Sequence, residues 1–130
     1  MRTDAQATGD DAESAVAADL EGSGWTIVAR NVRVGRGEID LVAIDPGPPR
    51  MLVMIEVRWR RTRAFGLPEE TIDHRKRAHL RAAIGRLLGD GLPGGVRLPR
   101  LPLRVDLVVV EPAAADGEPV RIRHHRAIAV

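Results

Sequence analysis

The sequence lacks several residue types, and each absence narrows the chemistry open to the protein. The 130 residues contain no cysteine, which excludes disulfides and thiolate metal sites. No apolar run approaches the roughly 20 residues that a membrane-spanning helix needs, so no membrane association is expected. Residues 1–6 contain no apolar signal segment, and a cytoplasmic location is therefore predicted.

Aromatic residues and lysines are also scarce. Aromatic residues make up only 2% of the chain, so Trp25 is interpreted as a packing residue, whereas Trp59, between two arginines, is open to packing or to stacking on bases. Lys76 is the only lysine, so nearly all of the 20 basic residues are arginine, and the net charge is +2. This mild excess permits nucleic-acid binding but does not demand it.

Hydrophobic periodicity predicts a single domain over residues 10–130 after a flexible tail at residues 1–9. Helices are expected at residues 10–21 and 68–88, the second with apolar cover from Ile72, Leu80, Ala83, Ile84, Leu87 and Leu88. Strands are expected at residues 25–33, 38–44, 51–58 and 103–110, and a last one within 120–130. Three closely spaced strands and a later helical crossover indicate an α/β fold with a mixed sheet.

Two carboxylates interrupt apolar strands. Residues 51–57 are apolar except for Glu56. Asp40 likewise lies within the mainly apolar segment of residues 37–44. Such strands are usually buried on both faces, and a buried carboxylate is costly unless something neutralises it. The pattern therefore favours a site for a cation; the structural alternative is that the acids only form ion pairs with Arg33, Arg58 or Arg60.

The connection between these strands predicts their register. A hairpin centred near Pro48 pairs Ile44 with Leu52, Val42 with Met54 and Asp40 with Glu56. Directly opposed side chains lie on one face, about 5 Å apart, and a divalent cation would turn the repulsion of two carboxylates into attraction. The same register pairs Glu38 with Arg58, unless a β-bulge shifts it.

The ordered set of motifs resembles the YraN-type family of uncharacterised proteins. The resemblance spans most of the chain and rests on residues 12–15, 30–33, 37–43, 55–60, 65–68, 76 and 104–108. That family is similar to restriction-endonuclease-like proteins with the PD-(D/E)XK core, including archaeal Holliday-junction resolvases. The resemblance implies an αβββαβ core with a metal-dependent phosphodiesterase site.

Carried over by position, the resemblance gives Asp40 and Glu56 the roles of the motif acids, and Glu13 that of an acid in the first helix. Arg58 stands where nucleases of this class usually carry lysine, and Ile39 replaces the proline before the motif aspartate. An arginine stays protonated and cannot act as a base, but it can clamp a phosphate.

The predicted cofactor is Mg²⁺ or Mn²⁺, because carboxylate oxygens are the ligands that these ions prefer. Asp40 and Glu56 would bind the ion. Glu13 would complete the site, or else it is only an acid in the first turn of a helix, stabilised by the helix dipole. Glu38 would pair with Arg58 without contacting the metal. Four basic residues are candidate phosphate contacts or else solvated side chains: Arg60, Arg61, Arg63 and Lys76.

Three functions remain open at this point. The first is a metal-dependent endonuclease acting on nucleic acid, DNA rather than RNA, and the second is a module of the same fold that binds without cutting. The third is a structural protein whose acids serve internal ion pairs, the role also predicted for Asp106 with Arg104. A homodimer is among the expectations, because resolvase-like proteins often pair, although no exposed apolar stripe indicates one.

Overall fold

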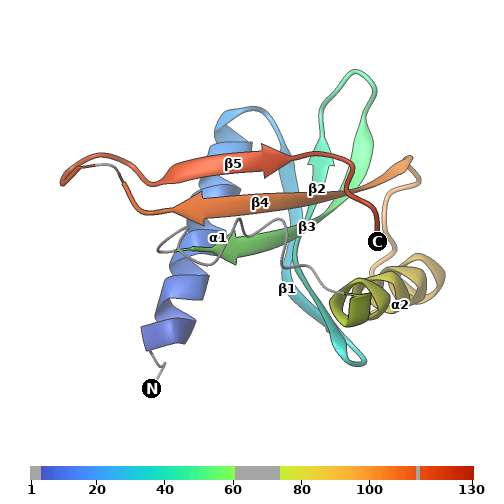
Figure 1. The fold of residues 1–130 in the computed structure, drawn as a ribbon. Coiled ribbons are helices and arrows are strands. Elements are labelled where there is room, and N and C mark those ends of the chain that lie inside the picture. The colour runs from blue at the N-terminus through green and yellow to red at the C-terminus, as the bar shows by residue number, and fades with distance from the viewer. Residues whose placement is uncertain (1–3, 61–73, 114) are drawn as a thin grey trace.

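In the computed structural model, residues 4–60, 74–113 and 115–130 are described, with side chains from residue 9 onward. The elements follow one another as α1 (Asp4–Gly22), β1 (Thr26–Val34), β2 (Gly37–Asp45), β3 (Met51–Trp59), α2 (His74–Asp90), β4 (Leu103–Glu111) and β5 (Arg121–His125) (Figure 1). This order confirms the α/β class and is compatible with an αβββαβ core. Residues 4–9, assigned above to a flexible tail, belong to α1.

The five strands form one mixed sheet in the order β1-β2-β3-β4-β5. β1, β2 and β3 are antiparallel neighbours, β3 and β4 are parallel, and β5 returns antiparallel to β4. The parallel pair confirms the crossover expected between β3 and β4. The paired residues of β2 and β3 include Ile44 with Leu52 and Val42 with Met54, so the predicted register is confirmed for this part of the hairpin.

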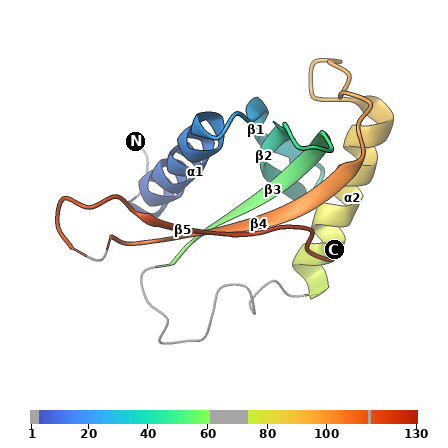
Figure 2. The ribbon, with the colours of Figure 1, turned by 90° about the horizontal axis from the view of Figure 1, so that it is seen from above.

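The two helices cover opposite faces of the sheet (Figure 2). Alternation along the strands divides their apolar residues between the helices. Leu41, Ala43, Val53 and Ile55 pack with α1. Val42, Leu52 and Met54 pack with the buried face of α2, formed by Leu80, Ala83, Ile84 and Leu87. Central strands buried on both faces explain the unbroken apolar sequence of β3.

Two expectations about α2 need correction or lie beyond the described residues. Leu88 was expected to pack in the core, but its side chain is 54% exposed, because it lies outside the buried face of the helix. Ile72 and the start of the predicted helix fall within residues 61–73, which lie outside the described ranges. Within those ranges, neither helix has the length and apolar character needed to cross a bilayer.

Candidate functional site

The last paired residues at this end of β2 and β3 are Leu41 and Ile55. Their chain neighbours Asp40 and Glu56, the two acids identified from the sequence, come next and are not part of the ladder. Beyond this point the backbone N–H of Val57 donates to Oδ2 of Asp40 at 2.7 Å. A side-chain carboxyl group thus accepts the bond that a strand carbonyl would take in a continued ladder. Asp40 therefore lies at the point where the two strands part.

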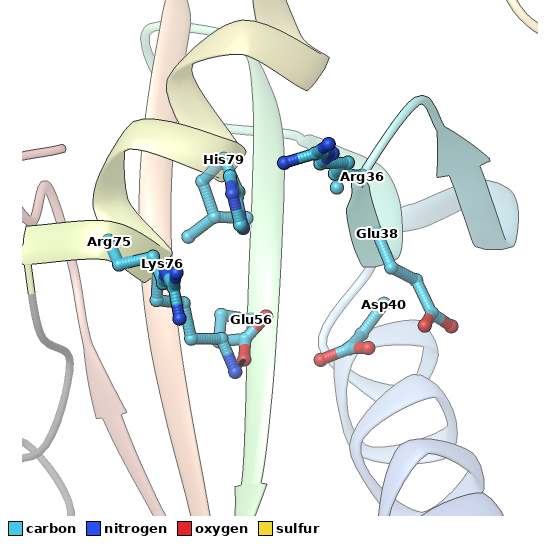
Figure 3. Close-up of a pocket in the computed structure, with 9 residues that line it drawn as sticks. Arg36, Glu38, Asp40, Glu56, Arg75, Lys76 and His79 are labelled. Atoms are coloured by element: carbon cyan, nitrogen blue, oxygen red, sulfur yellow. Dashed lines mark ion pairs between the residues drawn. The ribbon is translucent and has the colours of Figure 1, made fainter.

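Glu56 lies on the sheet face that α2 covers, since it stands two residues after Met54, which packs against that helix. Asp40 lies close to Glu56 and also to Glu13 of α1. The side chains of Asp40 and Glu56 point toward one another in the pocket (Figure 3). Glu56 is only 4% exposed, and Asp40 is half-buried. The pocket has a volume of about 330 Å³ and is lined by Arg36, Gly37, Glu38, Asp40, Glu56, Arg75, Lys76, His79 and Leu80.

The crowding of carboxyl groups changes their proton affinity. Burial, followed by the charge of Glu56, raises the pKa of Asp40 from 3.8 to about 8, against the hydrogen bond from Val57. Burial also raises the pKa of Glu13, where a hydrogen bond with Asp40 opposes the shift and the charge of Glu38 adds to it. Asp40 therefore holds a proton at neutral pH unless a cation replaces it.

Glu13 reaches this site from the middle of α1, which runs from Asp4 to Gly22. The helix dipole acts within the first and last turns, so the alternative explanation of Glu13 by the dipole is wrong. Its Oε2 atom is buried and has no hydrogen-bond partner in the described part of the chain.

Two basic residues contact Glu56. The ammonium group of Lys76 forms an ion pair with Oε1 of Glu56, and Nε of Arg58 lies 3.5 Å from the same oxygen. Lys76 was expected to contact phosphate or to be solvated, but the fold brings it to the acid pair. Glu38 lies 3.9 Å from Arg33, so the Glu38–Arg58 pair expected from the register is replaced by two other pairs.

Three further basic residues were candidate phosphate contacts. Arg60 is half-buried and its backbone N–H donates to the carbonyl of Val110 at 2.9 Å, which extends β3 along β4. Arg61 and Arg63 lie outside the described residues.

Sequence reasoning missed Arg36, Arg75 and His79, which line the pocket. Arg36 lies between the strands expected at residues 25–33 and 38–44, and Arg75 and His79 belong to the helix expected at residues 68–88. No local pattern reports that this turn and this helix meet, because the two are about 40 residues apart and join only through the packing of the sheet.

The carboxylates of the pocket are potential ligands for a divalent cation. In the described residues, no group of three or more His, Cys, Asp or Glu side chains is gathered as a ready-made metal site. Asp40 and Glu56 nevertheless offer hard oxygen donors side by side, and the buried Oε2 of Glu13 has no partner. This donor chemistry fits Mg²⁺ or Mn²⁺ with water completing the coordination.

A second polar cluster lies on the α1 side of the sheet. Arg104 donates to both oxygens of Asp106, at 2.8 and 2.9 Å, and also to Asp45 at 2.9 Å. His124 contacts Asp106 at 2.8 Å, and Arg104 lies 5.6 Å over the ring of Trp25. Burial would raise the pKa of Asp106, but these partners hold it at about 2. The structural role predicted for Asp106 with Arg104 is confirmed.

The fold and the site define a class of small α/β protein. Two acids lie where two central strands of the sheet separate, and a lysine from the crossover helix forms an ion pair with one of them. The chain belongs to the uncharacterised protein family UPF0102, whose profile matches residues 12–110. It is 41% identical over 112 residues to a UPF0102 protein of Symbiobacterium thermophilum, covering 84% of this chain and 85% of the relative.

Two other relatives show similar coverage. A UPF0102 protein of Dehalococcoides mccartyi is 38% identical over 104 residues, covering 80% of this chain and 79% of the relative. One of Xanthomonas campestris is 41% identical over 107 residues, covering 82% and 78%. The matched region contains Glu13, Asp40, Glu56 and Lys76.

Proposed function

We propose that this protein is a divalent-metal-dependent endonuclease that hydrolyses phosphodiester bonds in DNA. The observation that carries the proposal is the placement of Asp40 and Glu56 side by side in a pocket that the basic residues Arg36, Arg75 and Lys76 also line. Carboxylates can hold a hard cation, and arginine and lysine can hold the phosphate of the substrate.

The resemblance to restriction-endonuclease-like proteins and archaeal Holliday-junction resolvases is part of this proposal. The order of elements and the position of the acids on two adjacent antiparallel strands support it. Cleavage of a phosphodiester needs a positioned water and stabilisation of the charge that develops on phosphorus oxygens. A bound Mg²⁺ or Mn²⁺ would supply a more acidic water and part of that stabilisation.

In this proposal Asp40 and Glu56 hold the cation, and Glu13 contributes from α1. Asp40 would have to lose its proton to hold the cation, because a carboxyl group binds a metal in its deprotonated form. Arg58 stays charged at every relevant pH and orients the phosphate. Lys76 forms an ion pair with Glu56 in the protein alone, and its ammonium group would be available to phosphate if Glu56 held the cation.

The direct test incubates the purified protein with Mg²⁺ or Mn²⁺ and labelled duplex, single-stranded or four-way-junction DNA. Cleavage by the natural protein that is lost in both Asp40→Ala and Glu56→Ala supports the nuclease. An Asp116→Asn variant, altered at an exposed loop aspartate, is the matched control and should cleave normally. Absence of cleavage under all these conditions would rule the activity out.

One observation favours a second candidate, a module that binds nucleic acid without cutting it. Glu56 already has two basic partners, Lys76 and Arg58, in the protein alone. If these pairs persist, the acid is unavailable to a metal and the pocket remains a binding surface. DNA binding that is equal with and without divalent metal, and equal in Asp40→Ala, would identify this function.

A further inference from the structure

The pocket has a second wall that the acid pair does not explain. Arg36, in the turn between β1 and β2, and Arg75, on α2, both line it, with His79 between them and with Glu56 and Asp40 lower in the view (Figure 3). Both arginines are exposed. Within the described ranges, the ion pairs around the pocket belong to Arg33, Arg58 and Lys76, and neither Arg36 nor Arg75 takes part in one.

The relative position of these two arginines is fixed by close backbone packing. A Cβ atom on Gly37 would lie 2.7 Å from the carbonyl oxygen of His79 and 2.8 Å from Cβ of Ala83. Only glycine therefore lets the start of β2 approach α2 this closely. Arg36, directly before Gly37, is held beside the helix that carries Arg75, so the backbone positions of the two arginines are fixed relative to one another.

A second contact holds the same turn. Gly35 has a positive φ of 58°, and a Cβ atom there would lie 3.1 Å from Nη1 of Arg86 on α2. The turn therefore touches the helix on both sides of Arg36. Only the two side chains, and not the backbone that carries them, would have to be ordered when a ligand binds.

We propose that Arg36 and Arg75 bind a second backbone phosphate of nucleic acid, next to the one that faces Asp40 and Glu56. This inference rests on the proposed function for the identity of the ligand. Guanidinium groups match phosphate oxygens with pairs of parallel hydrogen bonds, and two arginines in one pocket that form no ion pair with any described residue suit an anion. His79, which lines the pocket between them, adds a hydrogen-bonding group.

The composition of the wall favours the backbone of a duplex over the bases of a single strand. Proteins that hold single strands stack the bases on aromatic side chains. In the described residues, Trp25 and Trp59 pack in the apolar cluster under α1, on the other face of the sheet. The pocket itself offers charged groups, and phosphate contacts carry no sequence information. Binding is therefore expected to be independent of sequence.

The test measures binding of a labelled duplex to the full chain, by fluorescence anisotropy without divalent metal, for the natural protein and the double variant Arg36→Gln/Arg75→Gln. The double variant should bind roughly tenfold or more weakly, and the slope of log K against log salt should fall by about 1, because the two arginines neutralise one phosphate. The matched control is Arg97→Gln/Arg100→Gln, which removes the same charge from exposed positions beyond the other end of α2. It should leave the slope unchanged.

The outcomes separate this site from the proposed activity. An unchanged salt slope in the double variant overturns the phosphate site, even if the natural protein cleaves DNA. A reduced slope supports the site, even if no cleavage occurs and the nuclease proposal fails. Tighter binding of a single strand than of the duplex overturns the duplex assignment. Displacement of bound duplex by equimolar inorganic phosphate would overturn the nucleic-acid backbone as the ligand.

Discussion

The ammonium group of Lys76 lies on the carboxylate of Glu56, so the only lysine of the chain joins α2 to the acid on β3. The residue two positions after Glu56 is Arg58, where the resemblance leads one to expect lysine. A compact ammonium differs from a guanidinium in that it can contact a single water closely. Helix α2 thus brings to Glu56 an ammonium group, whereas its own strand offers only the guanidinium group of Arg58.

Replacement of Lys76 by glutamine tests this assignment. If the protein is a nuclease, Lys76→Gln should lower kcat by roughly 100-fold, in the range seen when one group that stabilises developing charge is removed. Arg97→Gln removes an equal charge at an exposed position away from the pocket and should leave kcat unchanged. The measurement is single-turnover cleavage at saturating protein. A normal rate in Lys76→Gln would assign the lysine a structural role.

Metal affinity should depend on pH through Asp40, whose pKa is raised to about 8. Below that pH the cation must displace a proton, so the apparent Mn²⁺ affinity should rise about tenfold per pH unit between pH 6 and 8 and then level off. Calorimetric titration in two buffers of different ionisation enthalpy measures the affinity and the released proton together. An affinity that is constant from pH 6 to 9 would contradict ligation by Asp40.

The same carboxyl group should make the metal-free protein less stable as pH rises. The pKa of Asp40 is raised from 3.8 to about 8, so the folded state binds the proton more tightly than the unfolded chain, and stability falls between those two values. Asp40→Asn removes the effect and keeps an oxygen for the N–H of Val57. At pH 9 it should unfold with a free energy higher by on the order of a few kcal/mol.

Denaturant unfolding at pH 4 and pH 9 checks this expectation. Near pH 4 the natural protein and Asp40→Asn should differ little, and the exposed-site control Asp19→Asn should resemble the natural protein at both values. Equal stabilities of Asp40→Asn and the natural protein at pH 9 would show that Asp40 is ionised without cost.

How far the sequence predicts the site depends on which contacts are local. The pairing of Val42 with Met54 across the two strands follows from one short hairpin, and this prediction is confirmed. The end of the ladder does not follow, because it depends on the side-chain bond from Val57 to Asp40. Nor does the pairing of Glu56 with Lys76, because it requires α2 to be placed across the sheet.

The helices show the same division. The buried face of α2 follows from its periodicity, except that Leu88 points outward. The start of α1 was placed too late, since residues 4–9 contain no apolar residue larger than alanine and periodicity has nothing to register there. Helix formation there depends on propensity and on continuation of the helix from residues that do pack.

The cluster around Asp106 should be essential for stability but not for the site. Asp106 is fully buried, and its removal leaves Arg104 charged and only partly paired. Asp106→Asn should therefore lower the free energy of unfolding by roughly 3–5 kcal/mol, while metal binding at the pocket on the other face is retained at low temperature. Thermal unfolding together with Mn²⁺ titration measures both, with Asp116→Asn as the control. Loss of metal affinity in a folded Asp106→Asn protein would show coupling between the two faces.

Two glycines near the same helix should respond to alanine in opposite ways. A methyl group at Gly37 would meet the carbonyl oxygen of His79 at 2.7 Å and Ala83 at 2.8 Å, so Gly37→Ala should cost roughly 1–3 kcal/mol and push Arg36 away from α2. At Gly85, an exposed position within α2, nothing lies within 4 Å, and Gly85→Ala should stabilise the helix by about 0.5–1 kcal/mol. Denaturant midpoints of the two variants measure the contrast, and duplex affinity measures its effect on the pocket. If Gly37→Ala is as stable as Gly85→Ala and binds duplex normally, then close packing of the turn on α2 does not position Arg36.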